Sequence, residues 1–337
     1  MTERSSVGLV HGGPDAFGVP RHDFSTNSNA CGPCPEVLAA VRAADATRYP
    51  DPAYSALREA LATWHAVDPA RIVLAGSASE FIFRISGAVA RTGSGRVWLP
   101  VHGYGDYARA AEAWGLEPTA QPEAAQLLWV CDPASPLACP HENLAALVDN
   151  LTKAQACVLD LAYEPLRLSG TLALSSAQRE RVWQLWTPNK ALGLTGVRAA
   201  YAIAPVGAGA LVQRLARLAP SWPVGAHGVA LLDAWTRPSV RDWLAHSRDR
   251  LRDWKARQLA CCETLGWSVQ PSVANFFCAK PPNRDLTAHL ERLRTRGIKL
   301  RDTSSFGLPG RLRLGVLAPA AQDALMAAWT SIEVKQE

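Results

Sequence analysis

The sequence predicts an α/β protein in which helices cover both faces of a mainly parallel sheet, with a smaller α+β domain after it. From residue 70 to residue 204, short apolar runs alternate with longer amphipathic stretches, and this alternation is typical of βαβ units. Beyond residue 206, long helical stretches are followed by short strands. In parallel sheets of this kind, ligands bind at the carboxyl ends of the strands.

The apolar runs of the first part have the length and composition of buried strands. We expect strands at RIVLA (71–75), RVWLP (96–100), LLWVC (127–131), ACVLDLA (156–162), VWQLW (182–186) and RAAYAIA (198–204). The amphipathic stretches predict helices at 79–91, 107–115 and 141–154, and PEVLAAVRAA (35–44) predicts one before the sheet.

The second part begins with a helix at 206–219 and continues as a helical stretch with few breakers from about 226 to 264, in the manner of a spine between domains. From Trp267 onward, strands at 267–270, 274–280, 298–302 and 311–316 alternate with helices, which predicts a small α+β domain. We therefore expect an N-terminal arm (1–35), a large domain (36–225), a long helix (226–265) and a small domain (266–337).

The composition limits the class of protein. With 48% hydrophobic and 19% charged residues, the chain is too apolar for disorder. The net charge is only +5, and the basic residues at 292–301 are interleaved with apolar ones, so nucleic-acid binding is not expected. The apolar runs are too short to cross a bilayer, and the first residues lack a signal-peptide pattern. We therefore expect a cytoplasmic protein whose eight cysteines stay reduced.

Cys31-Gly-Pro-Cys34 has the spacing of a thioredoxin-type redox centre. The stretch after it reads as a helix, whose N-terminus would stabilise a thiolate. The preceding STNSNA (25–30), however, reads as an irregular loop and not as the buried strand that precedes such a centre. The other cysteines are scattered with few histidines near them, which argues against zinc. We interpret the motif as part of a loop and keep dithiol chemistry as the alternative.

The segment QLWTPNKALGLTGVRAAY (184–201) carries the strongest chemical signal. Its strand delivers Thr187 and Lys190 into a glycine-bearing loop, and Arg198 follows. A lysine in this position can form a Schiff base with an aldehyde cofactor whose phosphate binds the hydroxyl and the guanidinium. A surface lysine in a loop is the alternative, and the surrounding residues favour the cofactor.

Further candidates follow the ends of other expected strands. Asp160 ends a buried strand, where a carboxylate is costly without a cationic partner such as a protonated pyridine nitrogen. Tyr163 stands three residues later, within reach of the ring's phenolic oxygen. GSASE (76–80) turns from strand to helix through small residues, which suits a phosphate. Tyr104 could stack on the cofactor ring.

These residues lie in a series of motifs that resembles the fold-type I pyridoxal-phosphate enzymes of the aminotransferase class I/II superfamily. The chain is most similar to the branch of histidinol-phosphate aminotransferase and threonine-phosphate decarboxylase. The motifs that match are HGG (11–13), DFSTNSN (23–29), RYPDPAYSALREALA (48–62), GSASE, DLAY (160–163), NKALGLTGVR (189–198), SVANFF (272–277) and GIKLRDTSSFGLPGRLRLGV (297–316). The resemblance implies a large domain that binds pyridoxal 5'-phosphate on a mainly parallel, seven-stranded sheet between helices, as in aspartate aminotransferase, and a small α+β domain.

The resemblance also implies roles for single residues. Lys190 is the lysine that bonds to the cofactor aldehyde, Asp160 the partner of the pyridine nitrogen, and Tyr163 the neighbour of the phenolic oxygen. Tyr104 is the stacking ring. The residues implied for the cofactor phosphate are Ala78, Ser79, Thr187 and Arg198.

Other implied roles concern the substrate and a second subunit. Tyr49 resembles the tyrosine that the family lends across a dimer interface to the neighbour's cofactor phosphate, which implies a homodimer with shared active sites. Asn29 and Arg313 match the substrate-carboxylate site. The loop that holds Cys31 and Cys34 would then be part of the substrate lid.

Two positions depart from the family pattern. The branch usually carries Asn-Pro-x-Asn-Pro-Thr-Gly after the middle strand, and its second Asn bonds the phenolic oxygen of the ring. Here the segment is DPASPLACP (132–140), with the shorter Ser135 at that place. Asn189 precedes the lysine where Thr or Ser is common. These departures keep a non-catalytic scaffold as an alternative to an enzyme.

The resemblance leaves two reactions open, because the same lysine serves both. A substrate carboxylate in the ring plane gives transamination, whereas one turned out of the plane gives loss of CO₂. HGG and DTSSFGLPGRLRLGV (302–316) look more like the decarboxylase of cobalamin side-chain synthesis. We therefore expect a decarboxylase of O-phospho-L-threonine, with a histidinol-phosphate-type aminotransferase as the alternative. His11 and Arg301 are candidates to bind the substrate phosphate.

Overall fold

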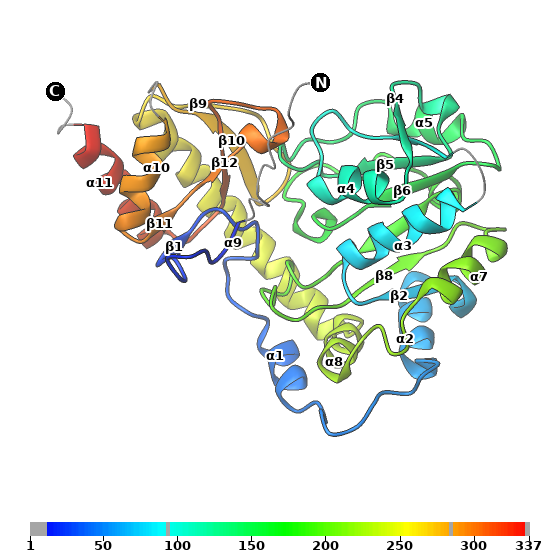
Figure 1. The fold of residues 1–337 in the computed structure, drawn as a ribbon. Coiled ribbons are helices and arrows are strands. Elements are labelled where there is room, and N and C mark those ends of the chain that lie inside the picture. The colour runs from blue at the N-terminus through cyan, green and yellow to red at the C-terminus, as the bar shows by residue number, and fades with distance from the viewer. Residues whose placement is uncertain (1–11, 92–94, 283–285, 334–337) are drawn as a thin grey trace.

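The computed structural model describes residues 12–91, 95–282 and 286–333. A large α/β domain and a small α+β domain are joined by the long helix α9 (Pro238–Thr264), which runs diagonally between them (Figure 1). The first strand, β1 (His22–Asp23), pairs with β11 (Ile298–Lys299) of the small domain. The expected fold class is confirmed.

The large domain is built on a seven-stranded sheet with the strand order β2-β8-β7-β6-β5-β3-β4. The strands are β2 (Ile72–Ala75), β3 (Arg96–Trp98), β4 (Glu117–Thr119), β5 (Leu127–Cys131), β6 (Ala156–Asp160), β7 (Trp183–Trp186) and β8 (Ala200–Ile203). Strands β4, β3, β5, β6 and β7 pair in parallel. Their carboxyl ends therefore lie along one edge of the sheet.

Two strands differ from the expected pattern. Strand β8 pairs antiparallel with both β2 and β7, because a loop without a crossover helix connects it to β7. An apolar run predicts that a strand forms but says nothing of its direction. Strand β4 has no strand pattern in the sequence, since it is a short and mostly exposed edge strand that contains Pro118, a residue that edge strands tolerate.

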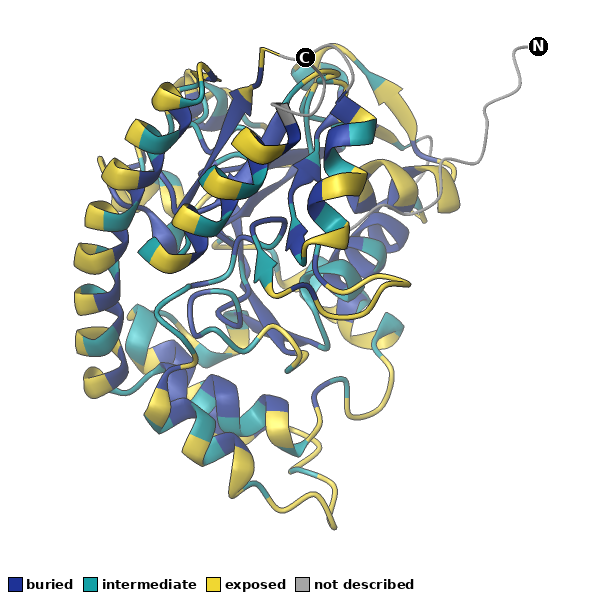
Figure 2. Cartoon of the chain, turned by 90° about the vertical axis from the view of Figure 1, so that its left-hand side faces the viewer, coloured by how far each residue is buried: buried dark blue, intermediate teal, exposed yellow. Residues whose placement is uncertain are grey.

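Helices cover both faces of the sheet, so its strands are buried while the helices expose one side (Figure 2). On one face, α3 (Ala78–Ala90), α4 (Gly105–Ala113) and α7 (Gly209–Leu218) share a core with the sheet. The other face is covered by α2 (Ser55–His65), α5 (Leu144–Asp149) and α8 (Ala226–Trp235). Helix α1 (Pro35–Arg42) packs on α8, and the short α6 (Ser176–Arg179) lies before β7.

The expected continuous helix over 226–264 is two helices. Helix α8 ends at Trp235 and α9 begins at Pro238, because proline lacks the N–H that a helix interior needs but fits the first helical turn. The expected helix at 141–154 is likewise shorter, and spans only Leu144–Asp149. In the part of the chain that the structure describes, no helix is both long and apolar enough to cross a membrane.

The small domain holds a four-stranded antiparallel sheet in the order β12-β13-β10-β9. Its strands are β9 (Ser268–Val269), β10 (Phe276–Lys280), β12 (Arg301–Asp302) and β13 (Leu312–Gly315). Helices α10 (Leu286–Thr295) and α11 (Pro319–Glu333) complete it. Short 3₁₀ helices occupy Pro69–Arg71, Pro122–Ala124, Glu164–Leu166 and Ser304–Phe306.

The burial of His65 at the end of α2 predicts that the free energy of unfolding depends on pH. Its Nε2 lies 2.8 Å from the hydroxyl oxygen of Tyr201, and burial lowers the pKa of the imidazole to about 3. Below the unfolded-state pKa of about 6.5, the unfolded chain binds a proton that the folded chain rejects, so stability falls as the pH falls. We expect this group alone to contribute a slope of about 1.4 kcal/mol per pH unit below pH 6.

Urea unfolding at pH 7.5, 6.5 and 5.5 checks this slope. The His65→Gln variant should lose less stability than the wild-type chain between pH 7.5 and pH 5.5. His246→Gln, at an exposed histidine of α9, serves as the control and should keep the wild-type slope. Identical slopes for all three proteins would contradict the prediction.

Candidate active site

The site lies where the parallel strands end. Lys190 stands in the turn after β7, Asp160 ends β6, and Ser135 follows β5. The turn around the lysine needs glycine, because Gly193 has a φ of +68° and a Cβ there would lie 2.6 Å from the carbonyl oxygen of Gly32. The sequence thus places these three side chains along one edge of the sheet.

The N-terminal loop is bound to the lysine turn through its backbone. The N–H of Asn29 donates to the carbonyl oxygen of Lys190 at 2.9 Å, and the N–H of Cys34 donates to that of Leu192 at 2.9 Å. The Asn29 side chain donates to the carbonyl oxygen of Ala191 at 2.9 Å and accepts the N–H of Cys31 at 3.0 Å. One N–H of its amide remains for a ligand.

The two cysteines of this loop lie in surroundings that do not favour a thiolate. Cys34 is buried and precedes α1 without capping it, and Cys31 is half-buried. Burial raises the pKa of both thiols, whereas a redox centre needs a lowered thiol pKa. The geometry therefore favours the loop interpretation of Cys31-Gly-Pro-Cys34 over dithiol chemistry.

Asp160 is a buried carboxylate held by neutral donors. The hydroxyl of Tyr107 donates to its Oδ2 at 2.6 Å, and the N–H of Ala162 donates to its Oδ1 at 2.9 Å. Burial raises the pKa of Asp160, while these two hydrogen bonds and the charge of Lys190 lower it. Within residues 12–91, 95–282 and 286–333, no cation lies at ion-pair distance from this carboxylate. The position therefore suits a cationic partner that the chain itself does not supply.

Tyr163 lies between the lysine and the N-terminal loop. The Nζ of Lys190 is 5.4 Å from the centre of the Tyr163 ring, and the Asn27 amide donates to the Tyr163 hydroxyl at 3.3 Å. The Oδ1 atom of Asn27 is buried without a hydrogen-bond partner. A buried acceptor of this kind is available to a donor of a bound ligand.

The N-terminus of α3 has the chemistry of a phosphate site. Ser77 caps the helix by accepting the N–H of Glu80 at 3.0 Å, and the N–H groups of Ala78 and Ser79 have no partner inside the helix. The Ser79 hydroxyl lies 3.1 Å from that of Tyr104. A phosphate placed here would face free N–H groups and the positive end of the helix dipole.

Thr187 directly follows β7 and begins the turn that carries Asn189 and Lys190. Its hydroxyl donates to the Oδ1 of Asn189 at 2.9 Å, and the amide of Asn189 reaches the carbonyl oxygens of Thr195 and Val197 at 3.4 Å. Asn189 therefore closes the loop that carries the lysine. The Thr187 hydroxyl would have to turn away from Asn189 to donate to a phosphate.

Two arginines of the small domain face the same region. Arg301 and Arg313 stand directly opposite each other in the antiparallel pair β12–β13, and both are buried. Arg313 donates to the carbonyl oxygen of Ser25 at 2.8 Å and to the hydroxyl of Ser135 at 3.3 Å, while its Nε has no partner. Ser135 is thus in contact with the arginine of the expected substrate site.

Two expected site residues make no hydrogen bond or ion pair with this cluster in the described part of the chain, and a third lies outside that part. Arg198 is exposed. Tyr49 is 77% exposed and stacks on Trp222, with ring centres 4.3 Å apart. His11 lies outside the described residues.

Sequence reasoning missed two residues of the site, although it included both in quoted motifs. Tyr107 ends HGYGDY (102–107), three residues after Tyr104, and Asn27 lies in DFSTNSN. The helical spacing of three between the two tyrosines was the available signal for Tyr107. No pattern in the sequence distinguishes Asn27 from the neighbouring loop residues.

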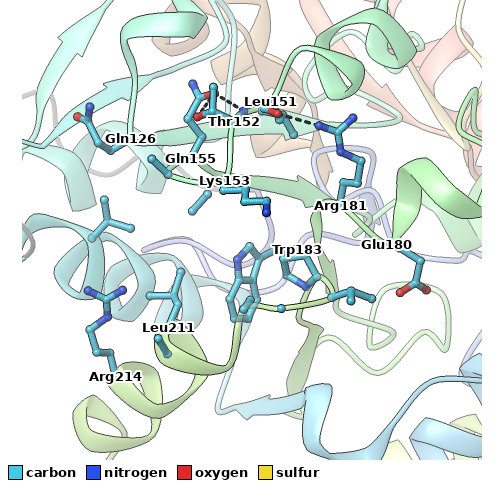
Figure 3. A pocket seen from close by; sticks show the side chains of 18 residues that line it. Gln126, Leu151, Thr152, Lys153, Gln155, Glu180, Arg181, Trp183, Leu211 and Arg214 are labelled. Atoms are coloured by element: carbon cyan, nitrogen blue, oxygen red, sulfur yellow. Dashed lines mark hydrogen bonds between the residues drawn. The ribbon is translucent and has the colours of Figure 1, made fainter.

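A hollow of about 700 Å³ lies at the opposite edge of the sheet. Its lining includes Gln126, Ala156 and Trp183, which stand at the amino ends of β5, β6 and β7. Figure 3 shows Trp183, Leu211 and Arg214 around it. None of the expected site residues lines this hollow, so it is separate from the candidate active site.

The turn lysine, the buried carboxylate and the N-terminus of α3 lie at one edge of the sheet, and this arrangement suits an enzyme that uses pyridoxal phosphate. The family model of aminotransferase class I and II matches residues 21–329. The chain belongs to this family, and the expectations of the family, the cofactor and an enzyme are confirmed.

Known relatives cover nearly the whole chain. Histidinol-phosphate aminotransferase of Ruegeria pomeroyi is 29% identical over 87% of this chain and 86% of its own length. The enzyme of the same name from Rhodospirillum centenum is 28% identical over 94% of this chain and 92% of its own length. The structure of histidinol-phosphate aminotransferase from Sinorhizobium meliloti in complex with pyridoxal-5'-phosphate has a TM-score of 0.81 and 23% identity, and covers 100% of this chain and 99% of that one.

These relatives correct one expectation. We expected a threonine-phosphate decarboxylase, and this expectation is wrong, because the curated relatives that match most of the chain are named histidinol-phosphate aminotransferase. The motifs HGG and DTSSFGLPGRLRLGV did not separate the two reactions. The lysine and the aspartate are needed for both, and the orientation of a substrate carboxylate leaves no distinct motif in the sequence.

Proposed function

We propose that the protein transfers an amino group between a phosphorylated amino compound of the histidinol-phosphate type and a 2-oxo acid. The names of the relatives support the reaction class. The single observation that supports an anionic substrate is the pair of buried arginines, Arg301 and Arg313, opposite each other on β12 and β13.

The two buried positive charges of the arginine pair favour a bound anion. Burial, and then the positive charge of Arg313, lower the pKa of Arg301 to about 10. Burial also lowers the pKa of Arg313, which forms no ion pair within the described ranges. A substrate phosphate or carboxylate would relieve both effects and would accept the free N–H of Arg313.

The residues at the sheet edge divide the binding of the cofactor among them. When bound, pyridoxal phosphate supplies an aldehyde that carries the amino group and a ring that stabilises negative charge at the substrate Cα. Asp160 would hold the ring nitrogen, and the N-terminus of α3 with Ala78 and Ser79 would bind the phosphate. Arg198 is exposed on this chain and would add a charge-assisted contact to the phosphate.

Lys190 would act as the base that moves a proton at the substrate Cα. Its Nζ lies above the Tyr163 ring, at the end of a flexible, half-buried side chain. The Tyr163 hydroxyl and the Asn27 amide are hydrogen-bonded to each other and would hold the phenolic oxygen of the ring. Arg313 would hold the carboxylate of the 2-oxo acid and so fix the position of its oxo carbon, which receives the amino group.

The proposed reaction is tested with purified protein loaded with pyridoxal phosphate. Histidinol phosphate and 2-oxoglutarate are added together, and formed glutamate is measured. We expect glutamate only when both substrates and the cofactor are present, and none with histidinol, which lacks the phosphate. Absence of glutamate formation by the loaded wild-type protein would refute this substrate assignment.

We also infer that two copies of the chain share their active sites. Tyr49 and Trp222 form an exposed aromatic pair, and the Trp222 Nε1 donates to the carbonyl oxygen of Pro50 at 3.1 Å. A hollow beside Tyr49 is lined by α8 residues that include Val229. An exposed apolar surface of this kind is typical of an interface. Tyr49 would reach the cofactor phosphate of the second copy.

Complementation checks the shared site. Lys190→Ala and Tyr49→Ala subunits are each expected to have low activity, and the Tyr49→Ala protein should bind the cofactor about tenfold more weakly. After both are mixed, dissociated and reassociated, some dimers contain one complete site, so activity should exceed the sum of the separate proteins. Sedimentation analysis must show a dimer. A monomer, or strictly additive activity, would count against the inference.

A further inference from the structure

Tyr107 is placed to control Asp160. It lies on α4, is buried, and stacks on Trp129 of β5 with ring centres 4.5 Å apart and 13° between the planes. This stacking fixes the direction of the hydroxyl, which donates to the Oδ2 of Asp160 at 2.6 Å. The backbone N–H of Ala162 holds the other oxygen. Both oxygens of the carboxylate therefore have a fixed donor, and each keeps one lone pair for a further partner.

The Tyr107 hydroxyl donates its hydrogen bond to a charged carboxylate that is buried away from water. Burial, together with the charge of Asp160, raises the pKa of Tyr107 well above its ordinary value, so the phenol remains a donor at every working pH. Two other titratable groups face the pair. Cys131 stands opposite Asp160 in the β5–β6 register, and burial raises the pKa of its thiol well above the ordinary range. Lys190 is the nearby cation. Without the Tyr107 hydroxyl, burial would favour the neutral carboxylic acid.

We propose that Tyr107 is a positioning residue that orients the Asp160 carboxylate, keeps it charged, and through it determines how firmly the protein holds the ring nitrogen of the cofactor. The inference rests on the role of Asp160 in the proposed function. Tyr107 itself need not touch substrate or cofactor. Its effect is transmitted by a single hydrogen bond, so the loss of one oxygen atom should reproduce it.

The Tyr107→Phe variant removes this oxygen and keeps the ring that stacks on Trp129. Two quantities are measured on the full-length protein without any substrate: the dissociation constant of pyridoxal phosphate, by equilibrium dialysis, and the pH at which the absorbance of the bound cofactor changes. We expect the variant to bind the cofactor about tenfold more weakly. The absorbance transition should move to higher pH, because a less positive ring lets the Nζ of Lys190 keep its proton longer.

A double-mutant cycle separates this role from mere packing. In the Asp160→Asn background, Tyr107→Phe should change both quantities by less than about twofold, because the charged acceptor is already gone. Tyr201→Phe removes another buried hydroxyl, one that accepts from the Trp235 indole at 3.1 Å, and should leave both quantities unchanged.

The outcomes that overturn the inference are distinct from those that overturn the proposed function. If Asp160→Asn alters cofactor affinity and absorbance but Tyr107→Phe does not, the positioning role is wrong and Asp160 keeps its assignment. An equal effect of Tyr107→Phe in both backgrounds would also refute it. If Asp160→Asn changes nothing, the assignment of Asp160 and the role of Tyr107 fall together. Failure of glutamate formation affects only the proposed substrates, since these measurements use none.

Discussion

Replacing Lys190 by alanine will reduce turnover by about a thousandfold or more. Lys190 stands at the carboxyl edge of the sheet, above the Tyr163 ring, and its charge acts on the buried carboxylate of Asp160. Within the described residues, no other lysine follows the carboxyl end of a strand of the seven-stranded sheet. In the proposed function, the variant therefore loses both the amine that would bond to the cofactor aldehyde and the base that would move the proton at the substrate Cα.

The variant should still fold, which separates chemistry from stability. The contacts that bind the turn to the N-terminal loop use the backbone of residue 190 and not its side chain, since the carbonyl oxygen accepts the N–H of Asn29. The melting temperature should therefore change little. Lys153→Ala, at an exposed lysine that lines the hollow at the amino ends of β5, β6 and β7, is the matched control and should retain wild-type turnover.

Borohydride reduction gives a second measurement that does not depend on the substrate. In the wild-type protein it should fix the cofactor on the peptide that contains Lys190, as detected by mass spectrometry, and in the Lys190→Ala variant this peptide should carry none. Turnover above a tenth of the wild-type value in the variant, or fixation on a different lysine in the wild-type protein, would refute the role of Lys190.

The sequence predicted the elements of the fold better than their directions and ends. Apolar runs located β5, β6 and β7 because buried parallel strands are apolar on both faces. The antiparallel direction of β8 depends on the connection from β7, which hydrophobicity does not record. The break between α8 and α9 had a signal in Pro238, but a helical pattern on both sides of it concealed the boundary.

For the site, too, the sequence predicted what depends on local pattern and left open what depends on tertiary packing. Asp160 and Lys190 were predicted because each follows a strand whose carboxyl end is fixed by its apolar pattern. The contact between Tyr107 and Asp160 joins α4 to β6 across 53 residues, and the opposition of Arg301 and Arg313 depends on the register of β12 with β13. Register and long-range contacts arise from tertiary packing, so a single sequence leaves them open.

Arg313 makes the second large prediction, because its charge is buried without an ion-pair partner among the described residues. The rings of Phe276 and Phe306 flank the guanidinium, at 5.8 and 5.6 Å from its central carbon. Its Nε points to no acceptor. A carboxylate that accepts from this group gains a charge-assisted hydrogen bond, which is worth about 1.5 to 3 kcal/mol.

The Arg313→Met variant should therefore have a KM for the 2-oxo acid that is about 10- to 100-fold higher, with a smaller change in kcat. Arg301→Met should instead raise mainly the KM for the phosphorylated amino compound, since Arg301 stands beside Arg313 on the edge strand β12 and brings a second buried positive charge to this region. Arg292→Met, at an exposed arginine of α10, is the control and should change neither constant. Steady-state kinetics, with each substrate varied in turn, measure KM and kcat for both substrates and so test these assignments. If Arg313→Met leaves the KM of the 2-oxo acid within threefold of the wild-type value, the guanidinium does not bind that carboxylate, and the buried charge must serve the phosphorylated substrate instead.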